Sequence, residues 1–122
     1  MKNYTGIDIV EIDRINLAME RWGERFLRRI YTEAEIRLCR NKSNVLAVRF
    51  AGKEAVMKLL GTGIRGVCWR DIEILSQPSG KPFVNLYGGA LREARRLGLS
   101  DIAVSLSHSR QYAIASVFST TE

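Results

Sequence analysis

Hydrophobic residues are densest between Val48 and Gly61, and their spacing predicts a buried helix. At about 100° per residue, the apolar side chains fall on nearly every side of this helix, which is typical of a buried one. Gly61 is suited to end it, because glycine readily adopts the left-handed conformation of helix ends. A polar turn at residues 41–43 precedes it. The apolar positions are Val48, Phe50, Ala51, Ala55, Val56, Met57, Leu59 and Leu60.

Charged residues interrupt this apolar pattern at Arg49, Lys53, Glu54 and Lys58. A buried charge costs several kcal/mol unless it is paired or holds a ligand. One interpretation is two intrahelical contacts at a partly hydrated edge, since Arg49 and Lys53 are one turn apart, as are Glu54 and Lys58. The alternative is a phosphate-rich ligand that takes up the surplus positive charge, with Glu54 available for a divalent metal.

The N-terminal pattern, from Tyr4 to Ile12, has the period of a strand. Ile7 and Ile9 alternate with glycine and aspartate, so we expect the two isoleucines to face the core. Asp8 then projects from the opposite face, beside Gly6. Asp13 is the expected cap of the next helix, which the pattern ends at Gly23, so Asp8 is left without a structural role.

The remaining pattern alternates short helices and strands. Thr32 and Glu35 fit a capping box, which predicts a helix from there to about Arg40. Strands are expected at Trp69–Leu75 and Pro82–Leu86 with a turn at 77–80, then a helix from Gly88 to Gly98. Two further strands, Ile102–Ser107 and Tyr112–Phe118, flank a turn that contains the only histidine, His108.

Composition narrows the class of protein. A chain of 122 residues without repeats or linkers predicts one domain over residues 1–122. We expect no membrane segment and no secretory leader. Cys39 and Cys68 are expected to be buried thiols in the reducing cytoplasm. The net charge of +6 favours an anionic partner.

Arginines are concentrated between Arg14 and Arg29. Arg14, Arg21, Arg25 and Arg28 share one helix face if the helix continues through Gly23. Such a stripe is most often a solvated face; the alternative is a docking surface for an acidic helix or a nucleic-acid backbone. The later motif from Gly61 to Gly66 has the letters G-x-G-x-x-G, but it follows a helix instead of a strand, so it predicts only a phosphate-contacting loop.

Together these motifs resemble the holo-(acyl-carrier-protein) synthases, the small bacterial 4'-phosphopantetheinyl transferases. The resemblance is collinear from Gly6 to Val117, although Tyr4 stands where the family commonly has a glycine. The motifs that carry it are GIDIVE (6–11), RFAGKEAVMK (49–58), GTGI (61–64), SGKP (79–82) and SLSHS (105–109).

The resemblance implies an α+β fold, with a small antiparallel sheet packed on the long helix, assembled as a homotrimer with sites between subunits. It implies Mg²⁺-dependent transfer of 4'-phosphopantetheine from coenzyme A to a serine of apo-acyl carrier protein, for fatty acid or polyketide synthesis, with release of adenosine 3',5'-bisphosphate. By similarity, the metal ligands are Asp8 and Glu54. The coenzyme A residues are Arg49, Lys58, Gly61, Gly63, Lys81, Pro82, Ser107 and His108.

The resemblance assigns catalytic roles to Glu54, Lys58 and His108, and carrier-protein docking to Arg14, Arg21 and Arg25. Glu54 and His108 are the candidate general bases, with Glu35 more distant. Neither nucleic acid nor a membrane is then needed as a partner. Two other classes stay open. A basic nucleic-acid-binding protein explains the charge but not the two carboxylates, and a catalytically idle scaffold predicts at most coenzyme A binding.

Overall fold

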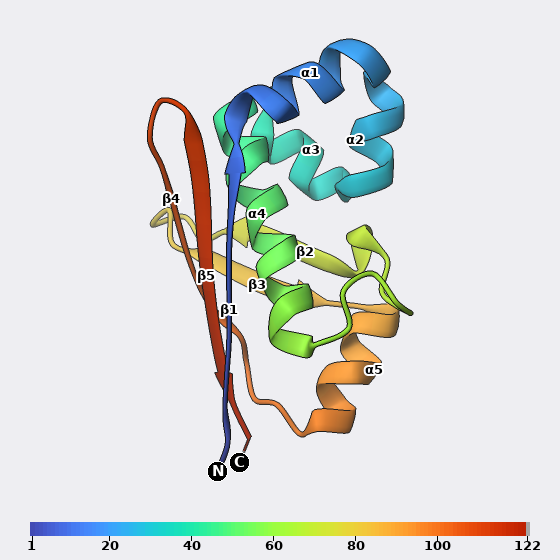
Figure 1. The fold of residues 1–122 in the computed structure, drawn as a ribbon, viewed down its shortest axis with the longest axis vertical. Helices are drawn as coiled ribbons and strands as arrows, with labels where there is room; N and C mark the ends of the chain where they lie inside the picture. Colours follow the sequence, from blue (N-terminus) through green and yellow to red (C-terminus); the bar gives the residue numbers. More distant parts are fainter. Residues whose placement is uncertain (122) are drawn as a thin grey trace.

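The computed structural model describes residues 1–121 and contains an α+β fold (Figure 1). The longest helix is α4, which runs through the middle of the molecule. The elements in chain order are β1 (Asn3–Glu11), α1 (Ile12–Trp22), α2 (Glu24–Ile30), α3 (Glu33–Cys39), α4 (Ser43–Leu60), the short 3₁₀ helix η1 (Trp69–Asp71), β2 (Ile72–Ser76), β3 (Pro82–Leu86), α5 (Gly88–Leu97), β4 (Ala103–His108) and β5 (Tyr112–Thr120).

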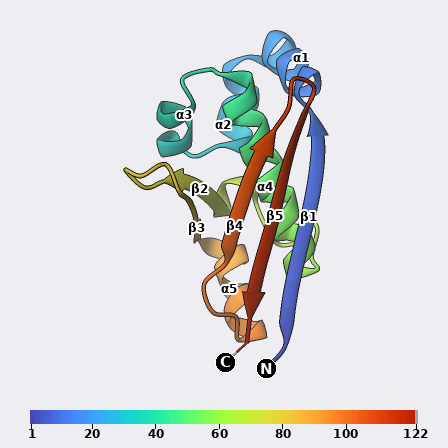
Figure 2. The same cartoon turned by 90° about the vertical axis from the view of Figure 1, so that its left-hand side faces the viewer.

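The larger sheet has the strand order β1-β5-β4, with antiparallel pairing throughout. Its inner face packs on α4, and its outer face is open, as the view in Figure 2 shows. The β2–β3 hairpin is a separate antiparallel pair beside α4. Helices α1 to α3 lie at one end of the molecule and α5 at the other (Figure 1). The small antiparallel sheet and long central helix predicted from the sequence are therefore present.

The inward-facing side of β1 differs from the prediction. Gly6 and Val10 are buried and Asp8 is half-buried against α4, whereas Ile7 and Ile9 are 57% and 59% exposed on the outer face of the sheet. The alternation itself was predicted correctly. The assignment of the isoleucines to the core was wrong within one chain, because a period of two does not say which face is covered.

Helix α1 also ends earlier than the arginine stripe requires. Gly23 has φ of +54° and separates α1 from α2, so the four arginines do not follow one continuous helix. Asp13 lies in the first turn of α1 instead of capping it, since the N-cap position is Glu11. The capping box of Thr32 and Glu35 is confirmed at the start of α3.

The structure also differs from the prediction at the start of β2, at Cys68 and at His108. The predicted strand from Trp69 begins only at Ile72, because residues 69–71 form η1. Cys39 is buried as expected, but Cys68 is exposed. His108 is the last residue of β4 and not part of the turn that follows. No helix within residues 1–121 is long and apolar enough to cross a bilayer.

Candidate active site

Two carboxylates from distant parts of the chain meet between β1 and α4. Asp8 lies in β1, and Glu54 lies in α4. The two elements approach closely at Gly6, where an added Cβ would lie 2.0 Å from the backbone oxygen of Ala55. Only glycine permits this approach. As a result, Asp8 and Glu54 lie close enough that, besides burial, the charge of Asp8 raises the pKa of Glu54.

The Asp8–Glu54 pair has the chemistry of a cation site. Burial, and then the charge of Asp8, raise the pKa of Glu54, while Arg14 and Lys58 oppose the shift. Two neighbouring carboxylates that repel each other favour either a shared proton or a bound cation. The pair fits Mg²⁺, which proteins usually hold through one or two carboxylates, with waters and substrate phosphates completing the shell. Residues 1–121 contain no cluster of three or more His, Cys, Asp or Glu side chains for a metal held by protein alone.

Lys58 lies one helical turn after Glu54 and completes this cluster. Its ammonium donates to Asp8 Oδ1 at 2.9 Å and to the backbone oxygen of Ile7 at 3.1 Å. The hydrogen bond and the charge of Asp8 raise the pKa of Lys58, which keeps it protonated. The side chain is 58% exposed, so the positive charge stands at the surface beside the two carboxylates. We call Asp8, Glu54 and Lys58 the carboxylate half-site.

A second cluster lies toward the other end of α4. A pocket of about 240 Å³ opens between the first turns of α4, the β2–β3 hairpin and the end of β4. Four of its lining residues were predicted to bind coenzyme A: Arg49, Pro82, Ser107 and His108. We call these four the pocket half-site. The remaining lining residues are Asn44, Val45, Val48, Ser76, Gly80 and Leu106.

Backbone and side-chain contacts hold Arg49 in the pocket wall. The residue is only 4% exposed. Its Nε donates to the backbone oxygen of Ile74 and its Nη2 donates to Ser76 Oγ, both at 2.9 Å. His108 Nε2 lies 3.3 Å from Asn44 Nδ2. Sequence reasoning did not single out Asn44, because a lone asparagine in the first turn of a helix has the pattern of an ordinary polar end.

The two half-sites lie on opposite edges of the sheet. The strand order places Asp8 and His108 on the two edge strands, β1 and β4. Neighbouring strands are about 4.8 Å apart, so the edge strands are separated by about 10 Å. Along the α4 axis, Arg49 and Lys58 are separated by about 13 Å. One chain therefore presents two half-sites and does not gather all the predicted residues in one place.

Four predicted coenzyme A residues lie outside the pocket, and one of them, Lys58, belongs to the carboxylate half-site. Lys81 is exposed in the turn of the β2–β3 hairpin, next to Pro82. Gly61 ends α4 with φ of +77°, and Gly63 follows with φ of +56°. Both glycines lie at the end of α4 that carries Lys58, so they belong with the carboxylate half-site and not with the pocket.

Comparison with known proteins identifies the family. The family model described as the 4'-phosphopantetheinyl transferase superfamily matches residues 4–117. The chain belongs to this superfamily. The family predicted from the sequence motifs is confirmed.

Similar proteins place this transferase among the holo-[acyl-carrier-protein] synthases. The synthase of Herpetosiphon aurantiacus is 49% identical, over 93% of this chain and 94% of that protein. That of Dehalococcoides mccartyi is 54% identical, over 93% and 95%. The Helicobacter pylori synthase, solved in complex with coenzyme A, superposes with a TM-score of 0.87 at 35% identity, over 95% and 99% of the two chains. The Neisseria meningitidis synthase gives 0.88 at 34% identity, over 97% and 98%. The predicted fold class is confirmed by these structures.

In this transferase the three predicted docking arginines line two neighbouring grooves on α1 and α2. Arg14 and Arg21 line a groove on α1 together with Leu17 and Trp22. Arg25 lines a second groove with Trp22, Phe26 and the stacked rings of Phe50 and Trp69. The guanidinium carbon of Arg14 lies 5.8 Å from the Phe50 ring centroid. Arg14 also acts on the carboxylate half-site, because its charge opposes the raised pKa of Glu54.

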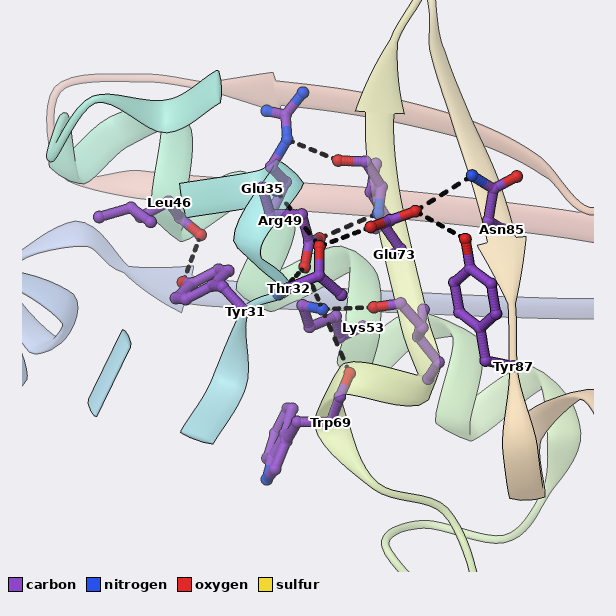
Figure 3. A network of polar contacts seen from close by, with 12 residues as sticks. Tyr31, Thr32, Glu35, Leu46, Arg49, Lys53, Trp69, Glu73, Asn85 and Tyr87 are labelled. Atoms are coloured by element: carbon purple, nitrogen blue, oxygen red, sulfur yellow. Dashed lines mark hydrogen bonds and ion pairs between the residues drawn. The ribbon is translucent and has the colours of Figure 1, made fainter. Parts of the chain in front are cut away.

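Sequence reasoning missed the buried partner of Lys53. Lys53 was counted among surplus positive charges, but its ammonium pairs with Glu35 at 2.7 Å, and both side chains are fully buried (Figure 3). The only sequence signal was the capping box, which places Glu35 at a helix start but not beside α4. Because the same carboxylate also bonds the backbone N–H of Thr32 and Ile74, Glu35 is occupied and is no longer a candidate base.

Proposed function

We propose that this chain transfers the 4'-phosphopantetheine arm of coenzyme A to a serine of apo-acyl carrier protein, in the service of fatty acid synthesis. The observation that carries the proposal is the meeting of Asp8, Glu54 and Lys58 at the surface between β1 and α4. Membership of the superfamily and the likeness to a synthase bound to coenzyme A support it.

The reaction is a phosphoryl transfer, so the protein mainly positions groups and stabilises charge. The serine oxygen forms a bond to the phosphorus that carries pantetheine, and the bond from that phosphorus to the bridging oxygen breaks. Adenosine 3',5'-bisphosphate leaves with the bridging oxygen, and the serine proton passes to a base. Lys58 is held by Asp8 where it can meet the charge of the diphosphate.

Asp8 and Glu54 would hold the Mg²⁺ ion that the family implies. When bound, the ion supplies positive charge to the diphosphate oxygens. The candidate bases come from both half-sites: Glu54 beside Asp8, and His108 in the pocket. A His108→Ala variant that keeps its kcat would assign the proton to Glu54, whereas a large fall in kcat with unchanged KM for coenzyme A would assign it to His108.

The pocket half-site is suited to the nucleotide end of coenzyme A. Arg49 supplies a fixed guanidinium for the 3'-phosphate, and Pro82 with the hairpin turn at Lys81 supplies a wall for the adenosine. Ser107 and His108 complete the lining toward the diphosphate. Gly61 and Gly63 would contact the part of the substrate held at the carboxylate half-site.

We further infer that the chain acts as a homotrimer in which each site joins half-sites from two subunits. The outer face of the sheet exposes large apolar side chains that a monomer would leave in water: Ile7, Ile9, Tyr112, Ile114 and Phe118. Packing of these faces around a three-fold axis would bring the β1 edge of one subunit toward the β4 edge of the next. That arrangement supports the joining of Asp8 from one chain with His108 from another.

Mass spectrometry of apo-acyl carrier protein tests the activity directly. Incubation with this protein, coenzyme A and Mg²⁺ is expected to add one phosphopantetheine group to the carrier. Asp8→Asn and Glu54→Gln should each reduce transfer by about 100-fold or more, since a metal's stabilisation of the transition state is worth several kcal/mol. Glu93→Gln, in an exposed ion pair on α5, is the matched control. An unmodified carrier with the parent protein would overturn the proposed function.

A further inference from the structure

Helix α4 has no single apolar stripe to fix its rotation about its own axis. Most surface helices have one apolar stripe, which determines the face that turns inward. In α4 every residue from Leu46 to Lys53 is buried, and so are Ala55, Val56 and Met57. The pattern of buried residues therefore does not define a single inward face of α4, and its rotation depends on specific contacts, such as the close packing of Gly52 on Ile74. Yet α4 carries Glu54, whose position relative to Asp8 defines the carboxylate half-site.

Lys53 supplies a directional contact at the middle of this helix. Its ammonium has three donors. One donates to Glu35 Oε1 at 2.7 Å, one to the backbone oxygen of Trp69 at 3.2 Å and one to that of Ile72 (Figure 3). The acceptors come from α3, η1 and the start of β2. All three meet the ammonium only at one rotation and one height of α4.

The acceptor side of this contact is itself fixed. Glu35 Oε1 also accepts from the backbone N–H of Thr32 at 2.9 Å, and its Oε2 accepts from that of Ile74 at 2.9 Å. The network continues from Thr32 to Glu73, whose carboxylate accepts hydrogen bonds from the hydroxyl of Thr32 and from the side chains of Asn85 and Tyr87. Glu35 is therefore anchored to two elements and cannot follow Lys53 if α4 turns.

The buried Lys53–Glu35 pair is not explained by stability. Replacing such a pair with uncharged side chains of similar volume is often neutral or stabilising, because taking both charges out of water is costly. Buried polar pairs can instead specify one arrangement among several that are equally well packed. The residue after Lys53 is Glu54, so the arrangement specified here includes the orientation of a proposed metal ligand.

We propose that Lys53 is a positioning residue, whose buried pair with Glu35 sets the rotation of α4 and so places Glu54 against Asp8. This inference rests on the proposed function. A side-chain tip lies about 6 Å from a helix axis, so a rotation of about 10° moves the Glu54 carboxylate by about 1 Å. Misplacement of a reacting group by about 1 Å can cost about 100-fold in rate.

The test is the double variant Lys53→Met with Glu35→Gln, which removes both charges and keeps similar volumes. The amide oxygen introduced at position 35 can still accept from one of the backbone N–H groups that Glu35 now serves. We expect the variant to fold with a lower Tm than the parent, because the backbone oxygens of Trp69 and Ile72 lose their donor. We expect kcat to fall by at least about 10-fold, with less than about 2-fold change in the KM for carrier protein. A crystal structure of the double variant should show the Glu54 carboxylate displaced by about 1 Å or more from its place beside Asp8.

The matched control is Arg96→Met with Glu93→Gln, which removes an ion pair from the exposed surface of α5. It should change neither kcat nor the position of Glu54. A double variant with parental kcat, or with reduced kcat but an unmoved Glu54, would overturn the positioning role. Should the double variant fail to fold, Lys53→Arg is the substitute, because it keeps a positive charge beside Glu35 but replaces the ammonium with a larger planar group. We expect a lower kcat and the same displacement of Glu54. Parental kcat in that variant would overturn the proposal.

The two proposals can fail separately. If the parent protein transfers nothing to carrier protein, the proposed function fails, and the displacement of Glu54 in the crystal structure alone decides the role of Lys53. If the parent is active and the double variant matches it, the positioning role fails and the function stands.

Discussion

Gly6 has no side chain, yet it sets the distance between the two carboxylates. Its Cα position lies so close to the Ala55 carbonyl that β1 and α4 meet backbone to backbone. Asp8 follows on the same side of β1, and Glu54 precedes Ala55 in α4. The geometry of the carboxylate half-site therefore depends on a residue that takes no part in the chemistry.

Gly6→Ala should separate these two elements. The new Cβ would lie 2.0 Å from the Ala55 oxygen, so β1 must move away from α4. We expect a loss of about 1–3 kcal/mol in the free energy of unfolding, typical of overpacking. We also expect kcat to fall by more than the stability loss explains, because Asp8 moves away from Glu54. Thermal denaturation and steady-state kinetics measure the two effects, with Thr5→Ala on the exposed side of β1 as the control. Parental kcat would contradict this view of Gly6.

The lowered pKa of Glu73 predicts how the stability of the fold depends on pH. Burial opposes its charge, but hydrogen bonds from Thr32, Asn85 and Tyr87, with the charge of Lys53, outweigh burial and lower its pKa below the ordinary 4.5. A carboxylate with a lowered folded-state pKa stabilises the fold above its unfolded-state pKa, and this stabilisation is lost as pH falls through the folded-state value. Denaturation of Glu73→Gln between pH 7 and about pH 3 should show a shallower loss of stability than the parent. If the stability of both proteins falls equally with pH, Glu73 does not contribute to the loss of stability in acid.

The scale of elements explains which site residues could be predicted. Glu54 and Lys58 could be proposed as site residues because they are one turn apart on one helix, and Asp8 because its strand position left it without a structural role. The pair of Lys53 and Glu35 was not, because their contact joins α4 to α3 and nothing local in the sequence encodes that packing. The prediction of four arginines on one continuous helix face was wrong for a similar reason. Gly23, with its positive φ, ends α1 where the periodicity alone allowed the helix to continue.

Helices α1 and α2 present the basic surface proposed to dock the acidic carrier protein. Arg21→Glu with Arg25→Glu should raise the KM for carrier protein by about 10-fold or more and leave the KM for coenzyme A within about 2-fold. Arg14 is left unchanged because its charge also acts on Glu54. Arg92→Glu with Arg95→Glu makes the same charge change on α5 and is the matched control. Added salt should weaken carrier binding by the parent and much less by the docking variant, because exposed charges are screened. Equal changes in both KM values would contradict the docking surface.

At the scale of the whole molecule, the outer face of the larger sheet exposes apolar side chains that no other part of the described chain covers. Period-two alternation in β1 was visible in the sequence, but the sequence could not show that the isoleucine face lies outside the core of its own chain. A face buried between subunits has the same pattern as one buried within a chain. The trimer accordingly came from family resemblance and remains a proposal.

Ile9→Glu tests that assembly, because it places a charge in the middle of the exposed apolar face. Light scattering should show a trimer for the parent and a monomer for Ile9→Glu, since an unpaired charge in an apolar interface costs several kcal/mol. Transfer activity should be lost with the trimer. Arg92→Glu, at an exposed position on α5, is the control for charge alone. A parent that is active as a monomer would contradict shared sites.

In the proposed trimer, the separation of the half-sites onto opposite strand edges would allow two inactive proteins to restore each other's activity. Asp8→Asn chains retain an intact pocket, and chains defective at His108 retain intact carboxylates. In mixed trimers of equal proportions, about one quarter of the junctions would combine two sound halves. Cells that carry both damaged genes would then regain activity that neither gene provides alone.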